Sequence, residues 1–541
     1  MARIVTIEQM RAIEAEADRR GVQYDAMMDR AGEGVFAHIL RRCGPARGKR
    51  VTVVCGGGNN GGDGLVAASL FARAGSDVHV ILAAGRKDGD PRLRAAAEAG
   101  CTIVSAVGES ERATALEPLA ESDILIDAVL GTGIRLPLRS PAAEILETLQ
   151  DRLSRIPRRP YVAAVDCPSG VDCDTGEAAP QAFPADLTVT LGAAKPGLIA
   201  FPAAELTGSL IVADIGLPED LKSLNVPGPL LADPGWVRNW LPRRPRNAHK
   251  GTFGRAIVVG GSVNYPGAPV LAGLGAYRAG TGLVSLAVPR CVYGAAVSQL
   301  PEATWIVLPE DMGVIAAGAM EALESELANT QALIVGPGFG REKPTAAFLK
   351  QLLFREQGRK APIGFSAAQP SGSPHERLRP PMVVDADALR LLAEQPDGPE
   401  MLPHGSVLTP HPGEMAALTG MPTEQIQKAR MDTAIRFARE WRSVVVLKGA
   451  FTAVADPDGR CAVAPFATAA LAHAGTGDVL AGVIGGLIAQ GLDGFPAAVL
   501  GVCLHGRAGE LAAEHGGTTD SVLAREVAAF LQHAIAELRE G

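Results

Sequence analysis

Short runs of β-branched and aliphatic residues alternate along the chain with longer Ala/Leu-rich segments, and glycine-rich turns separate them. Apolar runs bounded by turns are typical of buried strands. In the first half the pattern predicts strands at Val51–Cys55, Val78–Leu82, Ile124–Ala128, Val162–Asp166, Leu187–Leu191 and Leu210–Ala213. In the second half it predicts strands at Ala256–Gly260, Leu283–Val288, Ala332–Val335, Met382–Asp385, Ser406–Leu408 and Val444–Leu447.

Helices are predicted between many of these strands. The first begins after Thr6, which with Gln9 has the spacing of a capping box, and a second covers residues 26–41. Alternation of strands and helices favours an α/β fold with a mostly parallel, doubly wound sheet.

Two domains are predicted, over residues 1–225 and 226–541, because the proline-rich stretch Ile215–Pro245 has little periodicity. Residues 355–381 are rich in Pro, Ser, Gly and charge, so we expect an exposed insertion there without chemistry.

Charge and composition narrow the function classes. The chain has 51 basic and 59 acidic residues, a net charge of −8, which argues against nucleic-acid binding and against a polybasic membrane surface. The longest weakly polar stretches, such as residues 479–492, are interrupted by glycines and are too short to span a bilayer. The eight cysteines are irregularly spaced and the start of the chain has no secretory pattern, so we expect a cytoplasmic protein with reduced thiols and small-molecule partners.

A bare glycine loop, Gly56–Gly64, follows the strand Val51–Cys55 and precedes the predicted helix 65–75. Its backbone N–H groups are suited to binding a phosphate. The loop formally contains G-x-G-x-x-G, but Ala83-Ala84 stands where a dinucleotide fold would place the ribose-binding acid. A turn that needs only positive φ angles is the alternative, although it leaves Asn59, Asn60 and Asp63 unexplained.

Asp127 and Asp166 end two further strands of the same predicted sheet, where open α/β sheets bind ligands. With Asn60 and Ser169, Asp127 offers an all-oxygen set suited to an alkali or alkaline-earth cation. A helix or turn cap is the alternative for Asp127.

In the second half, Ala474-Gly475-Thr476-Gly477-Asp478 precedes an apolar helix. Its N–H groups predict an anion hole for a phosphoryl group, with Asp478 placed to accept a proton; a simple helix cap is the alternative. Lys448–Thr452 follows a strand and suits the phosphates of a nucleotide. His411, between two prolines at another strand exit, is a candidate ligand contact, or an ordinary histidine.

The motifs AGEGV, CGGGNNGGDGLVAA, DAVLGTGIRLP, VDCPSGVDCDTG and VTLGAAKPGL occur in this order within residues 1–215. Together they resemble the YjeF N-terminal domain family, the NAD(P)HX epimerases. The resemblance implies a Rossmann-like three-layer α/β sandwich, K⁺ held by Asn60, Asp127 and Ser169, and Asp166 as the catalytic residue against the hydrated nicotinamide ring. It also implies the substrate-binding residues Asn59, Asn60, Gly61, Gly62, Asp63, Gly131, Thr132, Gly133, Ile134, Arg135, Leu136, Pro137 and Asp166.

The G-x-G-D loop resembles ribokinase-like kinases. The fuller set HKGTFGRAIVVGG, VGPGFG, VVDADAL, LTPHPGEM, VVLKGAFT and HAGTGDVLAG, over residues 247–510, is more similar to the ADP-dependent NAD(P)HX dehydratases. This resemblance implies a ribokinase-like fold, ADP with Mg²⁺, Asp478 as the catalytic residue, and Ala268, Gly338, His411 and Asp478 as contacts of the substrate. It implies the nucleotide-binding residues Lys448, Gly449, Ala450, Phe451, Thr452, Gly475, Thr476 and Gly477.

The resemblances together imply a fused repair enzyme. Its first half interconverts the epimers of NADHX and NADPHX, its second half dehydrates the S epimer with ADP, and a homo-oligomer is expected. A vitamin or sugar kinase fused to a ligand-binding domain is the alternative, distinguished by a stable phosphorylated product from ATP. A non-catalytic scaffold is a third reading of the first half, which Asn60, Asp127 and Asp166 argue against.

Overall fold

The computed structural model describes residues 2–87, 89–353 and 379–540 of the chain. The chain forms two compact units, Met1–Asp233 and Pro234–Gly541, which we call unit 1 and unit 2. Most of the predicted insertion 355–381 lies outside the described residues.

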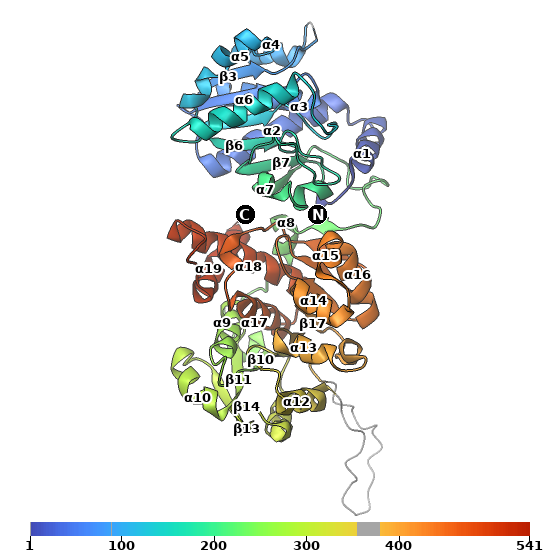
Figure 1. Ribbon diagram of the computed structural model, residues 1–541, viewed down its shortest axis with the longest axis vertical. Helices are drawn as coiled ribbons and strands as arrows, with labels where there is room; N and C mark the ends of the chain where they lie inside the picture. The colour runs from blue at the N-terminus through green and yellow to red at the C-terminus, as the bar shows by residue number, and fades with distance from the viewer. Residues whose placement is uncertain (1, 88, 354–378, 541) are drawn as a thin grey trace, which may run out of the picture. The chain divides into compact units, whose positions relative to one another are not determined.

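Unit 1 alternates strands and helices (Figure 1). Its strands are β1 Ala2–Arg3, β2 Arg50–Cys55, β3 Asp77–Leu82, β4 Thr102–Ser105, β5 Ile124–Ala128, β6 Tyr161–Val165, β7 Leu187–Leu191, β8 Ser209–Ala213 and β9 Leu230–Leu231. Its helices are α1 Ile7–Arg19, α2 Tyr24–Cys43, α3 Asn59–Arg73, α4 Pro91–Glu98, α5 Glu109–Ala115, α6 Ala142–Arg155 and α7 Ala204–Thr207.

The main sheet of unit 1 is parallel, in the order β4-β3-β2-β5-β6-β7-β8. Alternate side chains of one strand enter two different cores: Ile124 and Ile126 of β5 pack with α2 and α3, whereas Leu125 packs with α6. A sheet buried on both faces and covered by helices is a three-layer sandwich. The Thr6–Gln9 capping box predicted for α1 is present.

The start of helix α3 differs from the sequence-based expectation by six residues. Helix α3 begins at Asn59, so the second part of the glycine loop forms its first turn, although the helix was expected from Leu65. Low helix propensity favours loop for a glycine-rich run. Tertiary contacts outweigh that propensity, because the first turn is buried from Asn60 to Gly64.

Unit 2 repeats the alternation. Its strands are β10 Arg255–Val259, β11 Leu283–Pro289, β12 Thr304–Leu308, β13 Glu310–Asp311, β14 Val314–Ile315, β15 Ala332–Val335, β16 Met382–Val384, β17 Val407–Leu408, β18 Val444–Leu447, β19 Ala453–Ala455 and β20 Cys461–Val463. Its helices are α8 Pro234–Val237, α9 Ala268–Arg278, α10 Arg290–Ala296, α11 Met320–Leu327, α12 Lys343–Leu353, α13 Asp387–Ala393, α14 Pro412–Thr419, α15 Thr423–Lys428, α16 Arg430–Trp441, α17 Thr476–Ala489, α18 Gly494–Gly516 and α19 Ala524–Glu540.

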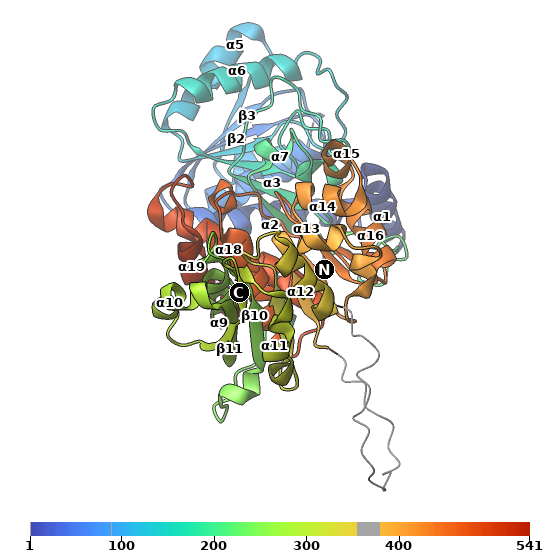
Figure 2. The ribbon, with the colours of Figure 1, turned by 60° about the horizontal axis from the view of Figure 1, so that its bottom comes forward.

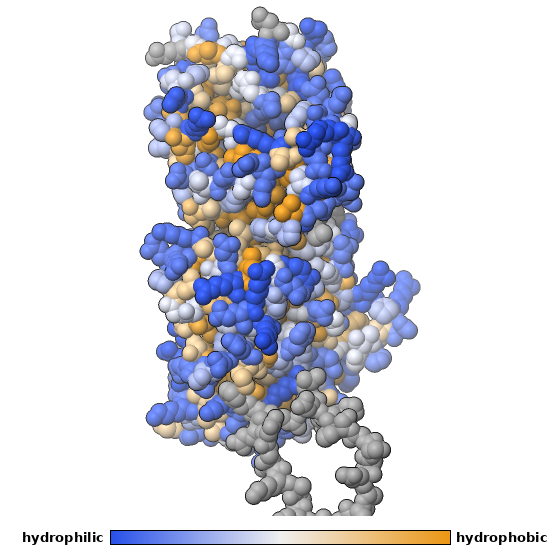
Figure 3. All heavy atoms as spheres, turned by 90° about the vertical axis from the view of Figure 1, so that its right-hand side faces the viewer, coloured by the Kyte–Doolittle hydropathy of each residue, from blue (hydrophilic) through white to orange (hydrophobic). Residues whose placement is uncertain are grey.

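The strands of unit 2 follow the order β20-β19-β18-β17-β16-β15-β10-β11-β12, parallel except at β18-β19 and β19-β20. Helices α13 and α14 lie side by side next to this sheet (Figure 2). On the face drawn in Figure 3, hydrophilic residues cover much of the surface, in line with the charged composition. Among the described residues, no helix is long and apolar enough to cross a membrane.

Helix α17 packs so closely on α9 that their backbones are in direct contact. A Cβ added at Gly482 of α17 would lie 1.9 Å from the carbonyl oxygen of Ala272, and one added at Gly275 of α9 would lie 2.3 Å from that of Val479. Only glycine permits this approach, which buries nearly the whole of α17.

We therefore expect Gly482→Ala to lower the melting temperature of unit 2 by on the order of 5 °C or more, because the added methyl group meets a rigid backbone. Differential scanning calorimetry measures the change. Gly294→Ala in α10 is the matched control, since nothing lies within 4 Å of its added Cβ. Equal melting temperatures for Gly482→Ala and the wild type would contradict the packing argument.

Candidate functional site

The topological switch point of unit 1 lies between β2 and β5, where the strand order reverses direction. Ligands of open α/β sheets bind outside the carboxyl ends of the strands at such points. The glycine loop after β2 and the loop after β5 meet there. A Cβ at Gly56 would lie 2.0 Å from the carbonyl oxygen of Val129, and one at Gly131 would lie 3.1 Å from Cβ of Asn60. Two of the predicted substrate segments are thus in contact.

Arg86 holds the glycine loop from outside. Its guanidinium donates to the carbonyl oxygens of Gly56 at 2.6 Å and Gly58 at 3.3 Å, and to the carboxylate of Asp90 at 2.7 Å. The loop carbonyls are therefore turned toward Arg86. Asn59 is exposed at the first residue of α3, where unsatisfied N–H groups favour an anion.

The three predicted cation ligands, Asn60, Asp127 and Ser169, lie in one hydrogen-bonded cluster. The Ser169 hydroxyl donates to Asp127 Oδ1 at 2.5 Å, and its backbone N–H donates to Asp127 Oδ2 at 2.8 Å. Leu130 links this pair to Asn60, whose Nδ2 donates to the Leu130 carbonyl oxygen at 3.0 Å. Asn60 Oδ1 is buried and has no hydrogen-bond partner within the described chain, and burial raises the pKa of Asp127.

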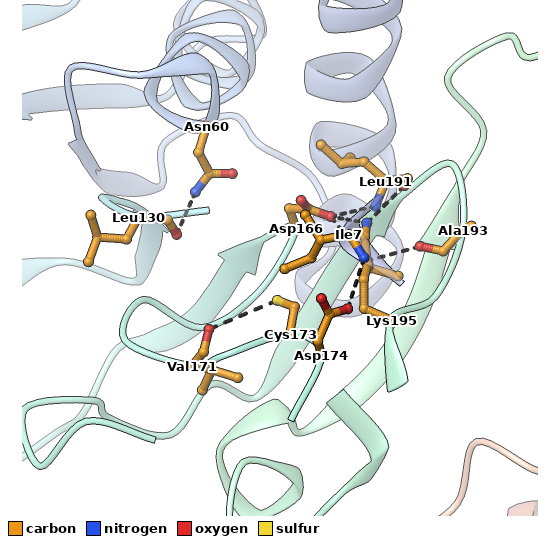
Figure 4. Close-up of polar contacts among 11 residues, drawn as sticks. Ile7, Asn60, Leu130, Asp166, Val171, Cys173, Asp174, Leu191, Ala193 and Lys195 are labelled. Atoms are coloured by element: carbon orange, nitrogen blue, oxygen red, sulfur yellow. Dashed lines mark hydrogen bonds and ion pairs between the residues drawn. The ribbon is translucent and has the colours of Figure 1, made fainter. Parts of the chain in front are cut away.

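Asp166 immediately follows β6 and has a φ of +64°, a strained value for a residue with a side chain. Its carboxylate is paired with the ammonium of Lys195 at 2.5 Å (Figure 4). Lys195 stands in the motif VTLGAAKPGL, yet sequence reasoning gave it no role, because nothing in the spacing joins it to Asp166. The structure therefore adds Lys195 to the candidate site.

The switch point of unit 2 lies between β10 and β15. Gly261, after β10, donates its N–H to the carbonyl oxygen of Pro337 at 2.8 Å, and so joins the two loops. A Cβ at Gly338 would lie 3.0 Å from that of Ala268. The predicted substrate contacts Ala268 and Gly338 are therefore neighbours at the position where a ligand is expected.

Lys448, at the end of β18, carries the main positive charge of the predicted nucleotide site. Its ammonium donates to Asp385 Oδ1 at 2.6 Å, and a Cβ at Gly477 would lie 3.4 Å from Nζ. The lysine therefore joins the first turn of α17 to the carboxyl end of β16. Thr452 closes the loop by donating to the Gly449 carbonyl oxygen at 2.8 Å, while Phe451 has a φ of +52° and is buried.

Asp478, in the first turn of α17, is close to several charged groups. Burial raises its pKa to about 8, with the carboxylates of Asp385, Asp387 and Glu414 acting in the same direction and Lys448 against them. Burial also raises the pKa of Glu414 to about 7. Two carboxyl groups that titrate near neutral pH in one cluster are typical of a proton-transfer site. Glu414 was not predicted as a site residue.

His411 is the N-cap of α14. Its Nδ1 accepts from the backbone N–H groups of Gly413 at 3.0 Å and Glu414 at 3.3 Å, and the Glu414 carboxylate accepts from the His411 N–H at 2.8 Å. This reciprocal cap fixes the ring, and burial lowers its pKa. The cap accounts for His411 structurally, and its contact with a ligand stays a prediction.

These two units, each with polar groups gathered at the carboxyl ends of a parallel sheet, define a two-domain α/β protein that binds small molecules. A family model described as YjeF-related protein N-terminus matches residues 24–197, and one described as NAD(P)H-hydrate dehydratase matches residues 256–362 and 372–533. The chain belongs to the family of bifunctional NAD(P)H-hydrate repair enzymes and contains both the epimerase and the dehydratase domain.

Curated relatives match over nearly the whole length. The bifunctional NAD(P)H-hydrate repair enzyme of Moorella thermoacetica is 38% identical over 95% of this chain and 93% of its own, and that of Escherichia coli is 32% identical over 96% and 91%. The crystal structure of the ADP/ATP-dependent NAD(P)H-hydrate dehydratase from Bacillus subtilis is 29% identical over 58% of this chain and 99% of its own, with a TM-score of 0.44.

The raised pKa of Asp478 predicts a pH-dependent stability change. The carboxyl has its ordinary pKa of 3.8 in the unfolded chain but a pKa of about 8 in the folded protein, so its contribution to stability falls as pH rises between these values. We expect Asp478→Asn to raise the melting temperature at pH 8.5 and to raise it less at pH 5.5. The gain at pH 8.5 is on the order of 1–3 kcal/mol.

Calorimetry at the two pH values, in the absence of ligands, measures this difference. Asp493→Asn is the control, an exposed carboxylate at the start of α18. A larger gain at pH 5.5 than at pH 8.5 would show that burial does not oppose ionisation of Asp478.

Proposed function

We propose that unit 1 interconverts the R and S epimers of NAD(P)HX and that unit 2 dehydrates the S epimer to NAD(P)H with ADP, giving AMP and phosphate. The membership of the chain in the repair-enzyme family supports the reaction pair. The clusters around Asp166 and Asp478, each at the carboxyl end of a parallel sheet, support the assignment of one reaction to each unit.

Epimerisation in unit 1 requires a group that moves a proton and stabilises positive charge. The hydrated ring has a hydroxyl beside its nitrogen, and inversion passes through a planar or ring-opened iminium-like species. The carboxylate of Asp166 serves both needs, because it can exchange the hydroxyl proton and attract the cationic ring. In this proposal the phosphates of the coenzyme lie along Asn59–Asp63 and Gly131–Pro137.

The cluster of Asn60, Asp127 and Ser169 fits K⁺. Asn60 Oδ1 is a buried oxygen without a hydrogen-bond partner among the described residues. The backbone of Leu130 is hydrogen-bonded both to the Asn60 amide and to the Ser169 hydroxyl, which in turn donates to the Asp127 carboxylate. Alkali cations take such neutral and anionic oxygens. When bound, K⁺ would supply fixed positive charge next to the glycine loop and the coenzyme phosphates.

We expect epimerisation to be faster in KCl than in NaCl of equal ionic strength. Asn60→Ala, which removes the unpartnered oxygen, should raise the K⁺ concentration for half-maximal rate by roughly tenfold or more. Chromatographic separation of the two epimers, without nucleotide, measures the rate. Tetramethylammonium chloride controls for ionic strength. An Asn60→Ala enzyme with the wild-type K⁺ response would contradict this cation site.

Dehydration in unit 2 follows from phosphoryl transfer. Asp478 takes the proton of the ring hydroxyl, whose oxygen bonds to the β-phosphorus of ADP as the bond from that phosphorus to the bridging oxygen breaks and AMP leaves. The ring nitrogen then expels phosphate with the C–O bond electrons, and loss of a proton from the adjacent carbon restores the dihydronicotinamide. A carboxyl with a pKa near 8 is a stronger base, once ionised, than an ordinary aspartate.

The nucleotide site in this proposal consists of Lys448–Thr452 and Gly475–Gly477. Within the described residues, no cluster of three His, Cys, Asp or Glu side chains could hold a metal ion. Mg²⁺ would therefore be bound mainly by the phosphates, as is usual for this ion, and would neutralise their charge. ADP as the donor, rather than ATP, rests on the family resemblance.

Reciprocal variants test the division of labour. Asp478→Ala should abolish recovery of NADH absorbance from the S epimer with ADP, because no base remains, while epimerisation continues. Asp166→Ala should slow epimerisation by about 10²-fold or more and leave dehydration of pure S epimer intact. Running the assay with ADP or ATP separates repair from the kinase alternative, which requires a stable phosphorylated product. Full turnover by Asp478→Ala would refute its role.

A cytoplasmic location and a homo-oligomeric state also belong to this proposal. The absence of a membrane-spanning helix among the described residues agrees with the first. Sedimentation analysis of the purified chain tests the second.

A further inference from the structure

Lys195 is almost completely buried and its ammonium is saturated with hydrogen bonds. Its side chain is 1% exposed, and Nζ donates to Asp166 Oδ1 at 2.5 Å, Thr190 Oγ1 at 3.0 Å and the Leu191 carbonyl oxygen at 3.1 Å (Figure 4). An ammonium has three protons, so all three are used. Lys195 therefore has no proton left for a ligand, and any effect it has on a reaction acts through Asp166.

The hydrogen bonds to Asp166 are one-sided. Oδ1 accepts from Lys195 Nζ, from Thr190 Oγ1 at 3.1 Å and from the Leu191 N–H at 3.0 Å. Among the described residues, Oδ2 accepts no hydrogen bond. The carboxylate is 13% exposed, so one oxygen is anchored and the other is left for a ligand.

The loop that carries Lys195 is itself fixed by the backbone. The N–H of Ala194 donates to the Arg3 carbonyl oxygen at 2.8 Å, and the Ala194 carbonyl oxygen accepts from the Val5 N–H at 2.9 Å. Directly after β7, the N–H of Gly192 donates to the carbonyl oxygen of Ala213 in β8 at 2.9 Å. The backbone that carries Lys195 is thus fixed by contacts that do not involve Asp166.

We propose that Lys195 is a positioning residue of the epimerase site, which holds Asp166 as a carboxylate in one orientation so that Oδ2 alone exchanges the proton with the hydrated ring. The inference rests on the proposed function of unit 1 and deepens it. The left-handed backbone of Asp166 agrees with it, since the strain at φ +64° persists only where surrounding contacts impose it.

Other titratable groups surround the pair. Glu14 of α1 and Asp63 of α3 interact with both Asp166 and Lys195, Arg92 of α4 acts on Asp63, and Cys167 and Cys173 act on Lys195. Burial raises the pKa of Glu14, and raises that of Asp63 well above its usual range. Burial opposes the charge of Lys195, but the attraction of Asp166 outweighs it and the pKa of Lys195 is raised.

Two variants separate the charge of Lys195 from its geometry. Lys195→Ala removes both, so we expect epimerase kcat/KM to fall by about 10²-fold and the acidic limb of its pH profile to move to higher pH, because Asp166 loses its cationic neighbour. Methylammonium added to the buffer should restore part of the rate. Lys195→Arg keeps the charge but cannot place three tetrahedral donors, so the rate should fall while the acidic limb stays.

The whole chain supplies the internal control. Dehydration of pure S epimer with nucleotide takes place in unit 2 and should be unchanged in both variants, which shows that the substitutions leave unit 2 folded. Lys222→Ala, an exposed lysine of unit 1, controls for loss of a charge.

If the wild type epimerises the substrate and Lys195→Ala does so at the same rate, this inference is overturned and the proposed function of unit 1 stands. A rate loss in Lys195→Ala without movement of the acidic limb and without amine rescue would also overturn it, because packing alone would then explain the loss. A wild-type protein that does not epimerise the substrate would instead refute the proposed function of unit 1.

Discussion

A parallel sheet covered by helices on both faces leaves its carboxyl edge as the place for polar chemistry, and each unit here secures that edge with one lysine–aspartate pair. Asp166 and Lys195 are 2.5 Å apart in unit 1, and Asp385 and Lys448 are 2.6 Å apart in unit 2. A buried charge without its partner is strongly destabilising, by roughly 3–5 kcal/mol. The pairs therefore allow charged carboxylates to remain buried at the carboxyl ends of the strands.

Glycine determines how closely the surrounding loops and helices approach these pairs. At Gly56 a side chain would collide with the loop after β5, and at Gly482 it would push α17 away from α9. The first contact forms the switch point of unit 1, while the second fixes the helix that begins with the predicted anion hole. Packing and the candidate sites thus depend on the same glycines, since these close contacts position the loop after β2 and the start of α17, whose N–H groups are predicted to bind phosphate.

Much of the fold could be predicted from the sequence, whereas the pairing of charges could not. The central strands β5, β7, β15 and β18 agree with their predicted ranges, because strands buried on both faces are rich in aliphatic and β-branched residues, and β15 and β18 are apolar throughout. The edge strands β4 and β12 were missed, since their partly exposed residues carry no such signal, and β19 and β20 are too short. Lys195 and Lys448 are separated from their aspartates by 29 and 63 residues, so only the tertiary fold shows the contact.

The two lysine–aspartate pairs differ in their relation to the candidate base. In unit 1 the paired aspartate is itself the candidate catalytic group. In unit 2 the pair is a neighbour of Asp478, and burial and the nearby carboxylates raise the pKa of Asp478 to about 8. Asp385 accepts one hydrogen bond from Lys448, and the same ammonium lies close to Gly477 in the first turn of α17, so the pair sets the charge around Asp478 without itself containing the candidate base.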